Sequence, residues 1–402
     1  MKFEELNINK KLLDKINEQG FKEMTLIQKK CLPEILKEKD VVGQAETGSG
    51  KTLGYCLPIL DKINHGKGIQ TLVLTPTREL CLQVTDVFIE FGKELMIKTT
   101  SVYGGVDIKP QIKNIRNSDV IVGTPGRIID HIHRKTINFE NIKFLVLDEI
   151  DKMFDMGFIE DVEYIISNVP KKRQTLMFSA TISKDIHRLL HKHLSNPLII
   201  KTQSYVDKDK LKQVYYDIYP SNKKFSLLVH LLKNNTSGLA IVFCATRRES
   251  DIIAKNLRHQ CIQASTIHGG MSQNKRLQSL NALKKGHTDV LVATDVAARG
   301  LDIKNVTHIY NYDVPKTSTE YLHRIGRTAR AGANGAAITL LTERDHDNFR
   351  RVQSNCDLII EKADFPNFIS VPFIIRFEQK KPFFRKNNHY FFVRQENYNF
   401  KN

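Results

Sequence analysis

Short β-branched and aliphatic runs alternate with longer stretches of helical pattern along most of the chain. Helical stretches at 78–93 and 107–117 accompany a first series of runs: TLVLT (71–75), VIVGT (120–124), FLVLDE (144–149) and TLMFSA (175–180). Continuous apolar runs between helices are typical of parallel strands that are buried on both faces. The alternation therefore predicts an α/β fold, in which helices cover both faces of a parallel sheet.

The alternation pauses once, at KTQSYVDKDKLK (201–212), which is polar and lacks an apolar period. A second series of runs follows: LAIVFCA (239–245), STIHG (265–269), DVLVAT (289–294), HIYNYD (308–313) and AAITLL (336–341). A chain of 402 residues is also too long for one ordinary core. We therefore expect five segments: an N-terminal region (1–30), a first lobe (31–203), a linker (204–212), a second lobe (213–362) and an extension (363–402).

The composition narrows the class of protein. The formal charge is +17, which is typical of nucleic-acid binders, although charge also serves solubility alone. The six cysteines form no C-x-x-C pair and several lie in apolar runs, which indicates buried thiols in a reducing compartment. We expect a cytoplasmic protein, because there is no apolar signal region and no run of about 18 apolar residues.

A glycine-rich segment, AETGSGKT (45–52), follows a short apolar step and precedes a helical stretch. Glycines let the backbone curl so that N–H groups face phosphate oxygens, and the helix adds its positive end. Lys51 can reach the outer phosphates, and the Thr52 hydroxyl can ligate magnesium. We interpret this segment as a phosphate loop. The alternative is a chance turn, because Ala45 stands where the general pattern has glycine.

An acidic pair follows the apolar run that ends at Leu147. The carboxyl ends of buried parallel strands form the ligand-binding edge of an open sheet. Asp148 suits a magnesium-holding carboxylate, and Glu149 suits the base that orients and deprotonates an attacking water. The alternative is a pair of helix N-cap acids, which the phosphate loop upstream disfavours.

The acidic segment DEID (148–151) resembles the D-E-A-D box of the DEAD-box ATP-dependent RNA helicases, and the phosphate loop is similar to that family's A-x-T-G-x-G-K-T. Other family signatures follow in the family order over residues 1–350: PTREL (76–80), Gly104-Gly105, TPGR (124–127), SAT (179–181), Gln273 with Arg276, TDVAARGLD (294–302) and HRIGRTAR (323–330). The segment DMGF (155–158) and the short tail are most similar to bacterial members of the RhlE type. The resemblance implies two RecA-like lobes and RNA-stimulated ATP hydrolysis coupled to local unwinding or remodelling of RNA duplexes.

The resemblance also implies where the first lobe binds ATP and Mg²⁺. Magnesium would be bound by Thr52 and Asp148. The nucleotide would be bound by Phe21, Gln28, Ala45, Thr47, Gly48, Ser49, Gly50, Lys51 and Thr52. Gln28 would read the adenine edge and Phe21 would pack on the base. Plain core packing is the alternative for Phe21 and for the upstream aromatic Phe3. Met24 and Leu26 depart from the family pattern, which leaves the selection of ATP over GTP open.

The second lobe is implied to complete the ATP site. Asp302 would contact the ribose, and Arg327 and Arg330 would act as arginine fingers on the γ-phosphate. Without the motif, the alternative is that these arginines lie on a solvent-exposed helix face. The catalytic residues implied by the family are then Lys51, Asp148, Glu149, Arg327 and Arg330. Because they come from both lobes, the site is complete only when the lobes close.

The resemblance assigns RNA to a separate surface. The residues are Pro76, Thr77, Arg78, Gly105, Thr124 and Arg127 in the first lobe, and Gln273, Arg276, Thr294 and Asp295 in the second. Such contacts would hold the RNA backbone, so we expect binding that is largely neutral to sequence, with 2′-hydroxyl contacts excluding DNA. Ser179 and Thr181 would couple the two sites, on the resemblance alone.

The extension departs from the α/β pattern. Residues 361–402 contain 11 aromatics and eight lysines or arginines against four acids. This mixture suits single-stranded RNA, through phosphate contact and base stacking. The alternative is that the apolar part packs on the second lobe and the end is disordered.

Three functions remain open on the sequence. An RNA-dependent ATPase that unwinds short duplexes is favoured by the complete catalytic motifs. An RNA clamp or annealing module and a DNA helicase are the alternatives. We expect a monomer without membrane contact, and ribosome-assembly or RNA-decay partners stay open.

Overall fold

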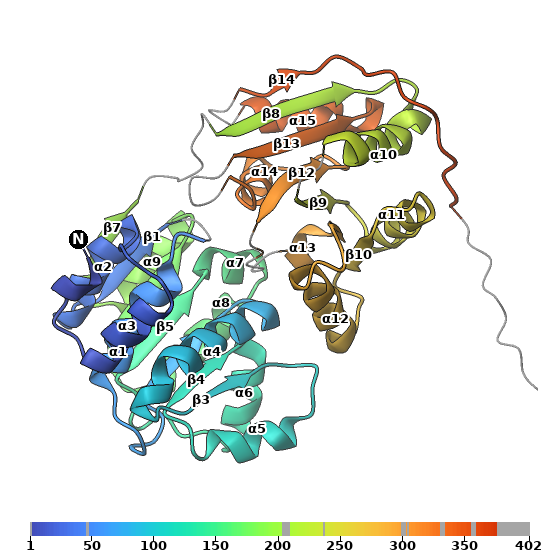
Figure 1. Cartoon of the computed structure of the whole chain (residues 1–402). Coiled ribbons are helices and arrows are strands. Elements are labelled where there is room, and N and C mark those ends of the chain that lie inside the picture. Colours follow the sequence, from blue (N-terminus) through green and yellow to red (C-terminus); the bar gives the residue numbers. More distant parts are fainter. Residues whose placement is uncertain are drawn as a thin grey trace, which may run out of the picture.

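Each half of the chain forms a parallel β-sheet covered by helices, which confirms the predicted α/β fold with two lobes (Figure 1). The computed structural model describes residues 2–45, 48–202, 210–235, 238–298, 303, 305–329, 334–354 and 359–375. The first sheet ends at Lys201 and the second begins at Leu211. Residues 211 and 212, which we expect in the linker from the sequence, therefore lie in the first strand of the second lobe.

The first sheet has seven parallel strands in the order β3-β4-β2-β5-β6-β1-β7. Their bounds are β1 (Val41–Gln44), β2 (Thr71–Leu74), β3 (Thr99–Val102), β4 (Val120–Gly123), β5 (Phe144–Asp148), β6 (Gln174–Ser179) and β7 (Leu198–Lys201). Neighbouring side chains on a strand point to opposite faces. On β5, Phe144 and Val146 belong to one core cluster, whereas Leu145 and Leu147 belong to another. Both faces are buried, so the strand appears in the sequence as a continuous apolar run.

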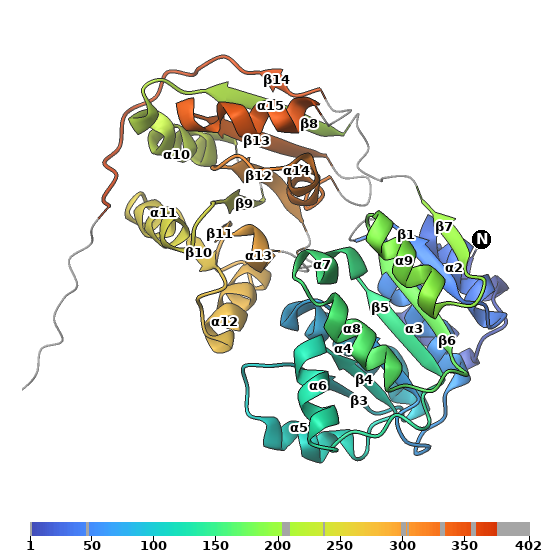
Figure 2. The same ribbon diagram turned by 180° about the vertical axis from the view of Figure 1, so that it is seen from behind.

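Helices cover both faces of the first sheet. The face of Phe144 is covered by α1 (Lys10–Glu18), α2 (Leu26–Leu36), α3 (Lys51–Lys62) and α4 (Arg78–Gly92) (Figure 1). The opposite face is covered by α5 (Ile108–Ile115), α6 (Pro125–His133), α7 (Ile150–Asp155), α8 (Ile159–Ser167) and α9 (Lys184–His193) (Figure 2). Two short 3-10 turns also belong to this lobe, η1 (Phe3–Glu5) and η2 (Lys93–Leu95).

The second sheet also has seven parallel strands, in the order β10-β11-β9-β12-β13-β8-β14. Their bounds are β8 (Leu211–Asp217), β9 (Leu239–Phe243), β10 (Ala264–Ile267), β11 (Val290–Ala293), β12 (Val306–Asn311), β13 (Gly335–Leu341) and β14 (Glu361–Lys362). One face packs under α10 (Lys224–Asn235) and α11 (Arg247–His259). The other packs under α12 (Gln273–Lys284), α13 (Asp295–Ala298), α14 (Ser318–Ile325) and α15 (His346–Ser354). The 3-10 turns are η3 (Ser221–Lys223) and η4 (Glu343–Asp345).

Apart from β1, of which the sequence shows only the apolar step Val41–Val42, four strands were not predicted from the sequence, namely β3, β7, β8 and β14. Three of them lie at the edges of their sheets, where one side of the strand has no partner among the described residues. Edge strands are less buried, as the pattern of mostly exposed residues on β7 shows, so they lack the continuous apolar run that marks a central strand. The fourth, β8, alternates buried and exposed residues near its start and reads as polar.

Part of the extension lies along the second lobe. The Asn256 side chain accepts from the N–H of Ile374 (2.8 Å) and donates to its C=O (2.9 Å). Phe368 and Val371 pack against a core cluster of that lobe. The described residues 363–375 therefore agree with the packing interpretation, and residues 376–402 lie outside the described residues. Within the described chain, no helix is both long and apolar enough to span a bilayer.

Candidate functional site

The segments that carry the predicted chemistry of the first lobe follow the ends of neighbouring strands. The phosphate loop follows β1, PTREL follows β2 and TPGR follows β4, whereas DEID begins at the end of β5 and SAT at the end of β6. These strands are adjacent in the sheet, in the order β4-β2-β5-β6-β1. Since parallel strands end at the same edge, the fold brings all five segments to the edge where open α/β sheets bind ligands.

The phosphate loop turns sharply between β1 and α3. Gly48 and Gly50 have φ angles of +86° and +90°, which residues with a side chain rarely adopt. Ser49 between them is half-buried. The buried Lys51 ammonium donates to the Ala45 carbonyl (2.7 Å), so this side chain folds back over the loop. The loop thus has the backbone that phosphate binding requires, with a lysine at its centre.

The Gln28 side chain ties the predicted adenine-reading element to the phosphate loop. Its amide donates to the Gly50 carbonyl (3.0 Å) and accepts from the Thr25 N–H (2.9 Å). A Cβ on Gly50 would overlap this amide, so the close approach requires glycine. Phe21 is 46% exposed and is free to stack on a base, whereas Phe3 is 3% exposed and packs in the core. Core packing therefore holds for Phe3 and not for Phe21.

Asp148 is a buried carboxylate with one oxygen bound and one without a partner. Its Oδ2 accepts a hydrogen bond from the Tyr55 hydroxyl (2.8 Å), and among the described residues nothing hydrogen-bonds its Oδ1. Burial raises the pKa of Asp148 to about 6, although the nearby Lys51 charge opposes the rise. A buried carboxylate oxygen without a partner costs free energy unless a cation or donor joins it. Asp148 thus has the form of a cation ligand.

Glu149 adopts a backbone conformation that is rare for its residue type. Its φ of +53° and ψ of +49° lie in the left-handed region, at the turn between β5 and α7. The Lys152 ammonium lies 2.6 Å from Oε1, and both side chains are buried. Burial alone would raise the pKa of Glu149, but the charges of Lys152, Lys51 and Arg327 lower it to about 2. Glu149 is therefore ionised at neutral pH, as a general base must be.

Asp151, the last acid of DEID, holds the SAT segment in place. Its Oδ2 accepts from the backbone N–H of Ala180 (3.0 Å), and from the N–H (3.0 Å) and the hydroxyl (3.2 Å) of Thr181. Ser179 donates in turn to the Thr181 carbonyl (2.6 Å). Of the two predicted coupling residues, Thr181 is bonded directly to the acidic segment that carries Glu149, and Ser179 is connected to that segment through Thr181.

Arg78 and Gly105 lie against each other among the predicted RNA contacts. Gly105 has a φ of +79°, and a Cβ at this position would overlap the Arg78 guanidinium. Thr77 caps α4, with its hydroxyl accepting from the Leu80 N–H (3.3 Å), next to the buried Pro76. The loops after β2 and β3 therefore meet at Arg78 and Gly105.

TPGR places its residues at the start of α6. Thr124 is the N-cap residue, and it is half-buried. Arg127 donates to the Val106 carbonyl (3.0 Å) and to the Gln111 side chain (3.3 Å). Arg127 is thus held within the first lobe beside the Gly104-Gly105 loop.

In the second lobe, Arg324 holds the start of α13. It pairs with Asp295 through two contacts, Nε to Oδ1 (2.6 Å) and Nη2 to Oδ2 (2.7 Å), and donates to the Asp313 carbonyl (2.6 Å). The predicted RNA contact Asp295 is therefore occupied by an arginine of the HRIGRTAR segment, and the neighbouring Thr294 is buried. A bidentate arginine–carboxylate pair fixes geometry as well as charge.

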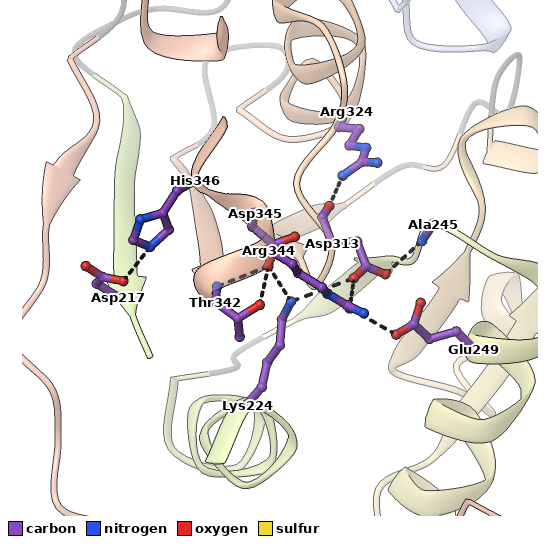
Figure 3. A network of polar contacts seen from close by, with 10 residues as sticks. All are labelled: Asp217, Lys224, Ala245, Glu249, Asp313, Arg324, Thr342, Arg344, Asp345 and His346. Atoms are coloured by element: carbon purple, nitrogen blue, oxygen red, sulfur yellow. Dashed lines mark hydrogen bonds and ion pairs between the residues drawn. The ribbon is translucent and has the colours of Figure 1, made fainter. Parts of the chain in front are cut away.

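A charged network continues from Asp313 across the ends of β9, β12 and β13 (Figure 3). Asp313 accepts from the Ala245 N–H (2.8 Å) and pairs with Arg344 (2.8 Å). Lys224 lies between Asp345 (3.0 Å) and Asp313 (3.7 Å). The network joins the loops after three strands, so it fixes the edge of the second sheet that carries Asp295.

The two lobes make direct contact through predicted RNA residues. On α12, Arg276 Nε lies 2.9 Å from Glu79 Oε1, and Gln273 donates to the same oxygen (3.3 Å). Glu79 belongs to PTREL on α4 of the first lobe. Arg327 of the second lobe is buried, and its charge lowers the pKa of Glu149 in the first. The arrangement therefore brings the second-lobe arginine towards the acidic pair.

Three predicted site residues lie outside the described residues: Thr47, Asp302 and Arg330. Four side chains with clear roles in this geometry were not assigned from the sequence: Tyr55, Glu79, Asp151 and Arg324. The signal for Tyr55 was its position on α3, three residues after Thr52 and thus on the same helix face. Asp151 and Arg324 lie within recognised motifs, but their partners are distant in sequence.

Comparison with known proteins identifies the family. A family model described as DEAD/DEAH box helicase matches residues 25–189, and one described as helicase conserved C-terminal domain matches residues 223–332. The chain is 44% identical over 367 residues to the DEAD-box ATP-dependent RNA helicase CshA of Bacillus subtilis, covering 90% of this chain and 74% of that one. CshA of Geobacillus kaustophilus is 43% identical, and the match covers 90% of this chain and 78% of that one.

Solved structures agree with this assignment. Saccharomyces cerevisiae Dbp5 bound to RNA and ADP BeF3 is 30% identical, with a TM-score of 0.82 over 90% of this chain and 95% of that one. A DEAD box protein from Methanococcus jannaschii is 39% identical, with a TM-score of 0.56 over 90% and 99%. This chain belongs to the DEAD-box family of ATP-dependent RNA helicases, and its two lobes are RecA-like. The relatives named here are CshA proteins, and the likeness to the RhlE type stays a prediction.

Proposed function

We propose that this enzyme hydrolyses ATP at a site shared by both lobes, and that RNA stimulates the reaction by holding the lobes together. The observation that carries this proposal is electrostatic. Arg327 of the second lobe is near enough to the acidic pair of the first to lower the pKa of Glu149. The same approach is supported by the ion pair between Glu79 and Arg276 (2.9 Å).

Each group at the site has a part in this chemistry. Glu149 orients the attacking water and takes its proton. Lys51 and the loop N–H groups of Gly48, Ser49 and Gly50 hold the phosphates, with Ala45 and Thr47 beside them. Arg327 and Arg330 stabilise the charge that develops on the γ-phosphate, a contribution of about 10³–10⁵ in rate for such arginines. Phe21 and Gln28 bind adenine, and Asp302 binds the ribose.

Magnesium fits the residues that the structure brings together. Among the described residues, the buried Asp148 Oδ1 has no hydrogen-bond partner, and Thr52 lies at the start of α3. Within the same part of the chain, no group of three or more His, Cys, Asp or Glu side chains is arranged so that it could hold a metal ion by itself. This suits a cation that is held mostly by phosphates, with one carboxylate and one hydroxyl from the protein. When bound, the ion would neutralise charge on the β- and γ-phosphates.

We assign RNA to the surface that runs from PTREL and TPGR of the first lobe to α12 and α13 of the second. Its residues are Pro76, Thr77, Arg78, Gly105, Thr124, Arg127, Gln273, Arg276, Thr294 and Asp295. Arg78 beside Gly105 suits a phosphate that approaches the backbone closely. Three of these residues act indirectly, because other side chains bind them. Glu79 binds Arg276 and Gln273, and Arg324 binds Asp295. Ser179 and Thr181, through Asp151, link this surface to Glu149.

The lobe arrangement supports the same account. The chain overlays on Dbp5 bound to RNA and ADP BeF3 with a TM-score of 0.82 at 30% identity. On the Methanococcus jannaschii protein the TM-score is 0.56, although the identity is higher at 39%. An arrangement similar to that of an RNA-bound relative suits a site completed from both lobes.

Substitution of the base tests the proposal. Glu149→Gln keeps the shape of the side chain but cannot accept the proton, so RNA-stimulated phosphate release should fall by at least about 10² while ATP still binds. Glu163→Gln is the matched control, because Glu163 pairs at the surface with Lys192 (2.9 Å). Phosphate release at the wild-type rate by Glu149→Gln would show that Glu149 is not the base. Loss of ATP binding by this variant would show a structural role instead.

Measuring ATP hydrolysis with RNA and with DNA oligonucleotides as activators separates this proposal from a DNA helicase. Equal stimulation of hydrolysis by the two would indicate a DNA helicase. An RNA clamp or annealing module would bind RNA with no ATP-dependent duplex unwinding.

We further propose a cytoplasmic monomer that acts with ribosome-assembly or RNA-decay partners. The location is supported by the cysteines of the described chain, all of which are free thiols. The segment bounds are likewise a proposal, with the first lobe at 31–203 and the second lobe beginning at 211, where β8 starts.

A further inference from the structure

Tyr55 lies at the centre of the first lobe with its hydroxyl at the predicted magnesium site. The residue is on α3, one turn after Lys51, and its side chain is fully buried. The ring packs between Phe178 (centroids 5.2 Å apart) and Phe88 (6.3 Å). The hydroxyl donates to Asp148 Oδ2 (2.8 Å). The aromatic contacts thus fix the ring, and the ring fixes the direction of the hydroxyl.

The second predicted magnesium ligand, Thr52, belongs to the same helix as Tyr55. Thr52 lies three positions before Tyr55 on α3. Residues three apart on a helix are neighbours on one face. Tyr55 therefore bonds one of the two protein groups to which we assign the ion, Asp148, and shares a helix face with the other, Thr52.

We infer that Tyr55 is a positioning residue for magnesium, an inference that rests on the ion site proposed above. A carboxylate bound at neither oxygen can rotate about its bond to Cβ. The Tyr55 hydroxyl occupies Oδ2, which leaves Oδ1 as the oxygen without a partner among the described residues. A fixed carboxylate loses less freedom when the ion binds, so affinity for the ion is greater.

Tyr55→Phe tests this inference, because it removes the hydroxyl and keeps the packed ring. The probe is a fluorescent ADP titrated into the full chain, first with chelator and then at increasing Mg²⁺. We expect unchanged ADP affinity with chelator, and a Mg²⁺ concentration for half-maximal tight binding that is about 10-fold higher or more. An unchanged Mg²⁺ requirement would overturn the inference. An equal loss of ADP affinity with and without Mg²⁺ would do the same, because it would indicate a general disturbance of the phosphate loop.

Tyr321→Phe is the matched control. It also removes a buried hydroxyl with a hydrogen bond, from Tyr321 to Gln213 Oε1 (3.0 Å), but in the second lobe. We expect both variants to lower the melting temperature, and only Tyr55→Phe to change the Mg²⁺ requirement. A similar change in both would mean that any lost buried hydroxyl has this effect, and the inference would be wrong.

Asp148→Asn separates this inference from the ion site itself. If the site is correct, Asp148→Asn raises the Mg²⁺ requirement, and adding Tyr55→Phe to it has no further effect. If Asp148→Asn leaves the requirement unchanged, the ion site proposed above is wrong. If Asp148→Asn raises it and Tyr55→Phe does not, the ion site stands and only the role of Tyr55 is rejected.

Discussion

Glu79 of the first lobe and Arg276 of the second form an ion pair, with 2.9 Å between Oε1 and Nε and side-chain exposures of 3% and 14%. Gln273 donates to the same carboxylate (3.3 Å). The pair lies between residues that the family resemblance assigns to RNA, and it is formed only when the lobes are together. A buried charge is costly when its partner leaves. The pair therefore links the relative position of the lobes to the RNA surface.

Removing this charge should weaken RNA binding in the closed state. Glu79→Gln leaves Arg276 without a carboxylate, which for a buried pair costs about 2 kcal/mol or more, or roughly 30-fold in affinity. RNA affinity measured with a non-hydrolysable ATP analogue should fall, whereas ATP affinity without RNA should not. Glu90→Gln is the control, because Glu90 pairs at the surface with Lys15 (2.6 Å). Equal RNA affinity for wild type and Glu79→Gln would contradict the role of the pair.

Asp151→Asn should disturb coupling more than hydrolysis. One oxygen of Asp151 accepts three hydrogen bonds from SAT, and the neutral amide weakens each of them. We expect a loss of about 2 kcal/mol in stability and fewer duplexes unwound per ATP consumed. Unwinding and phosphate release measured together report the ratio. Asp347→Asn, at an exposed pair with Arg350 (3.4 Å), should leave that ratio at the wild-type value. An unchanged ratio in Asp151→Asn would remove Asp151 from the coupling path.

Gly105→Ala should weaken RNA binding by displacing Arg78. The added Cβ overlaps the Arg78 guanidinium, and the φ of +79° adds backbone strain of about 1–2 kcal/mol. Gly66→Ala is a matched control, because Gly66 has a φ of +76° and open space around the added Cβ. Both variants should lose similar stability, and only Gly105→Ala should lose RNA affinity. If both bind RNA as the wild type does, Arg78 is not an RNA contact.

The stability of the second lobe should depend on pH through Glu249. Burial and the neighbouring Asp313 raise the pKa of Glu249 from 4.5 to about 7. The folded state therefore holds this proton more tightly than the unfolded state, and the stability contribution of Glu249 falls as pH rises from about 4.5 to about 7. Glu249→Gln stays neutral throughout that range. Relative to wild type, the variant should gain about 1–2 kcal/mol between these pH values, allowing for partial exposure.

Thermal melting of both proteins at about pH 5 and about pH 8 measures this gain. The difference in melting temperature between variant and wild type should be larger at the higher pH. Glu90→Gln is the control: Lys15 lowers the pKa of Glu90, so Glu90 is ionised in the folded protein at both pH values and the difference from wild type should be nearly the same at both. A difference for Glu249→Gln that is the same at both pH values would show that Glu249 has an ordinary pKa.

The fold and most of the first-lobe site could be predicted from the sequence for a physical reason. Central parallel strands are buried on both faces, so β2, β4, β5 and β6 appear as apolar runs, and the reactive residues follow them directly. Edge strands β3 and β7 could not be predicted, because exposure on one side allows polar residues. Glycines of the phosphate loop were predictable, because their positive φ angles suit few other residues.

Contacts between residues far apart in the chain could not be predicted. The partners Tyr55 and Asp148 lie 93 residues apart, and Glu79 and Gln273 lie 194 apart. Local spacing indicates which residues share a helix face or follow a strand, but the distance between two strand ends depends on the strand order. The same limit applies to Asp295, whose partner Arg324 is on another helix of the second lobe.

The central claim is that catalysis requires Arg327 of the second lobe to lie close to Glu149, the base in the first lobe. Single-turnover ATP hydrolysis by Arg327→Gln at saturating RNA tests it directly, with RNA and ATP binding measured in parallel. The account predicts that binding changes little and that the hydrolysis step slows by about 10³ or more, to a rate that RNA no longer raises. Hydrolysis by Arg327→Gln at the wild-type, RNA-stimulated rate would contradict the account.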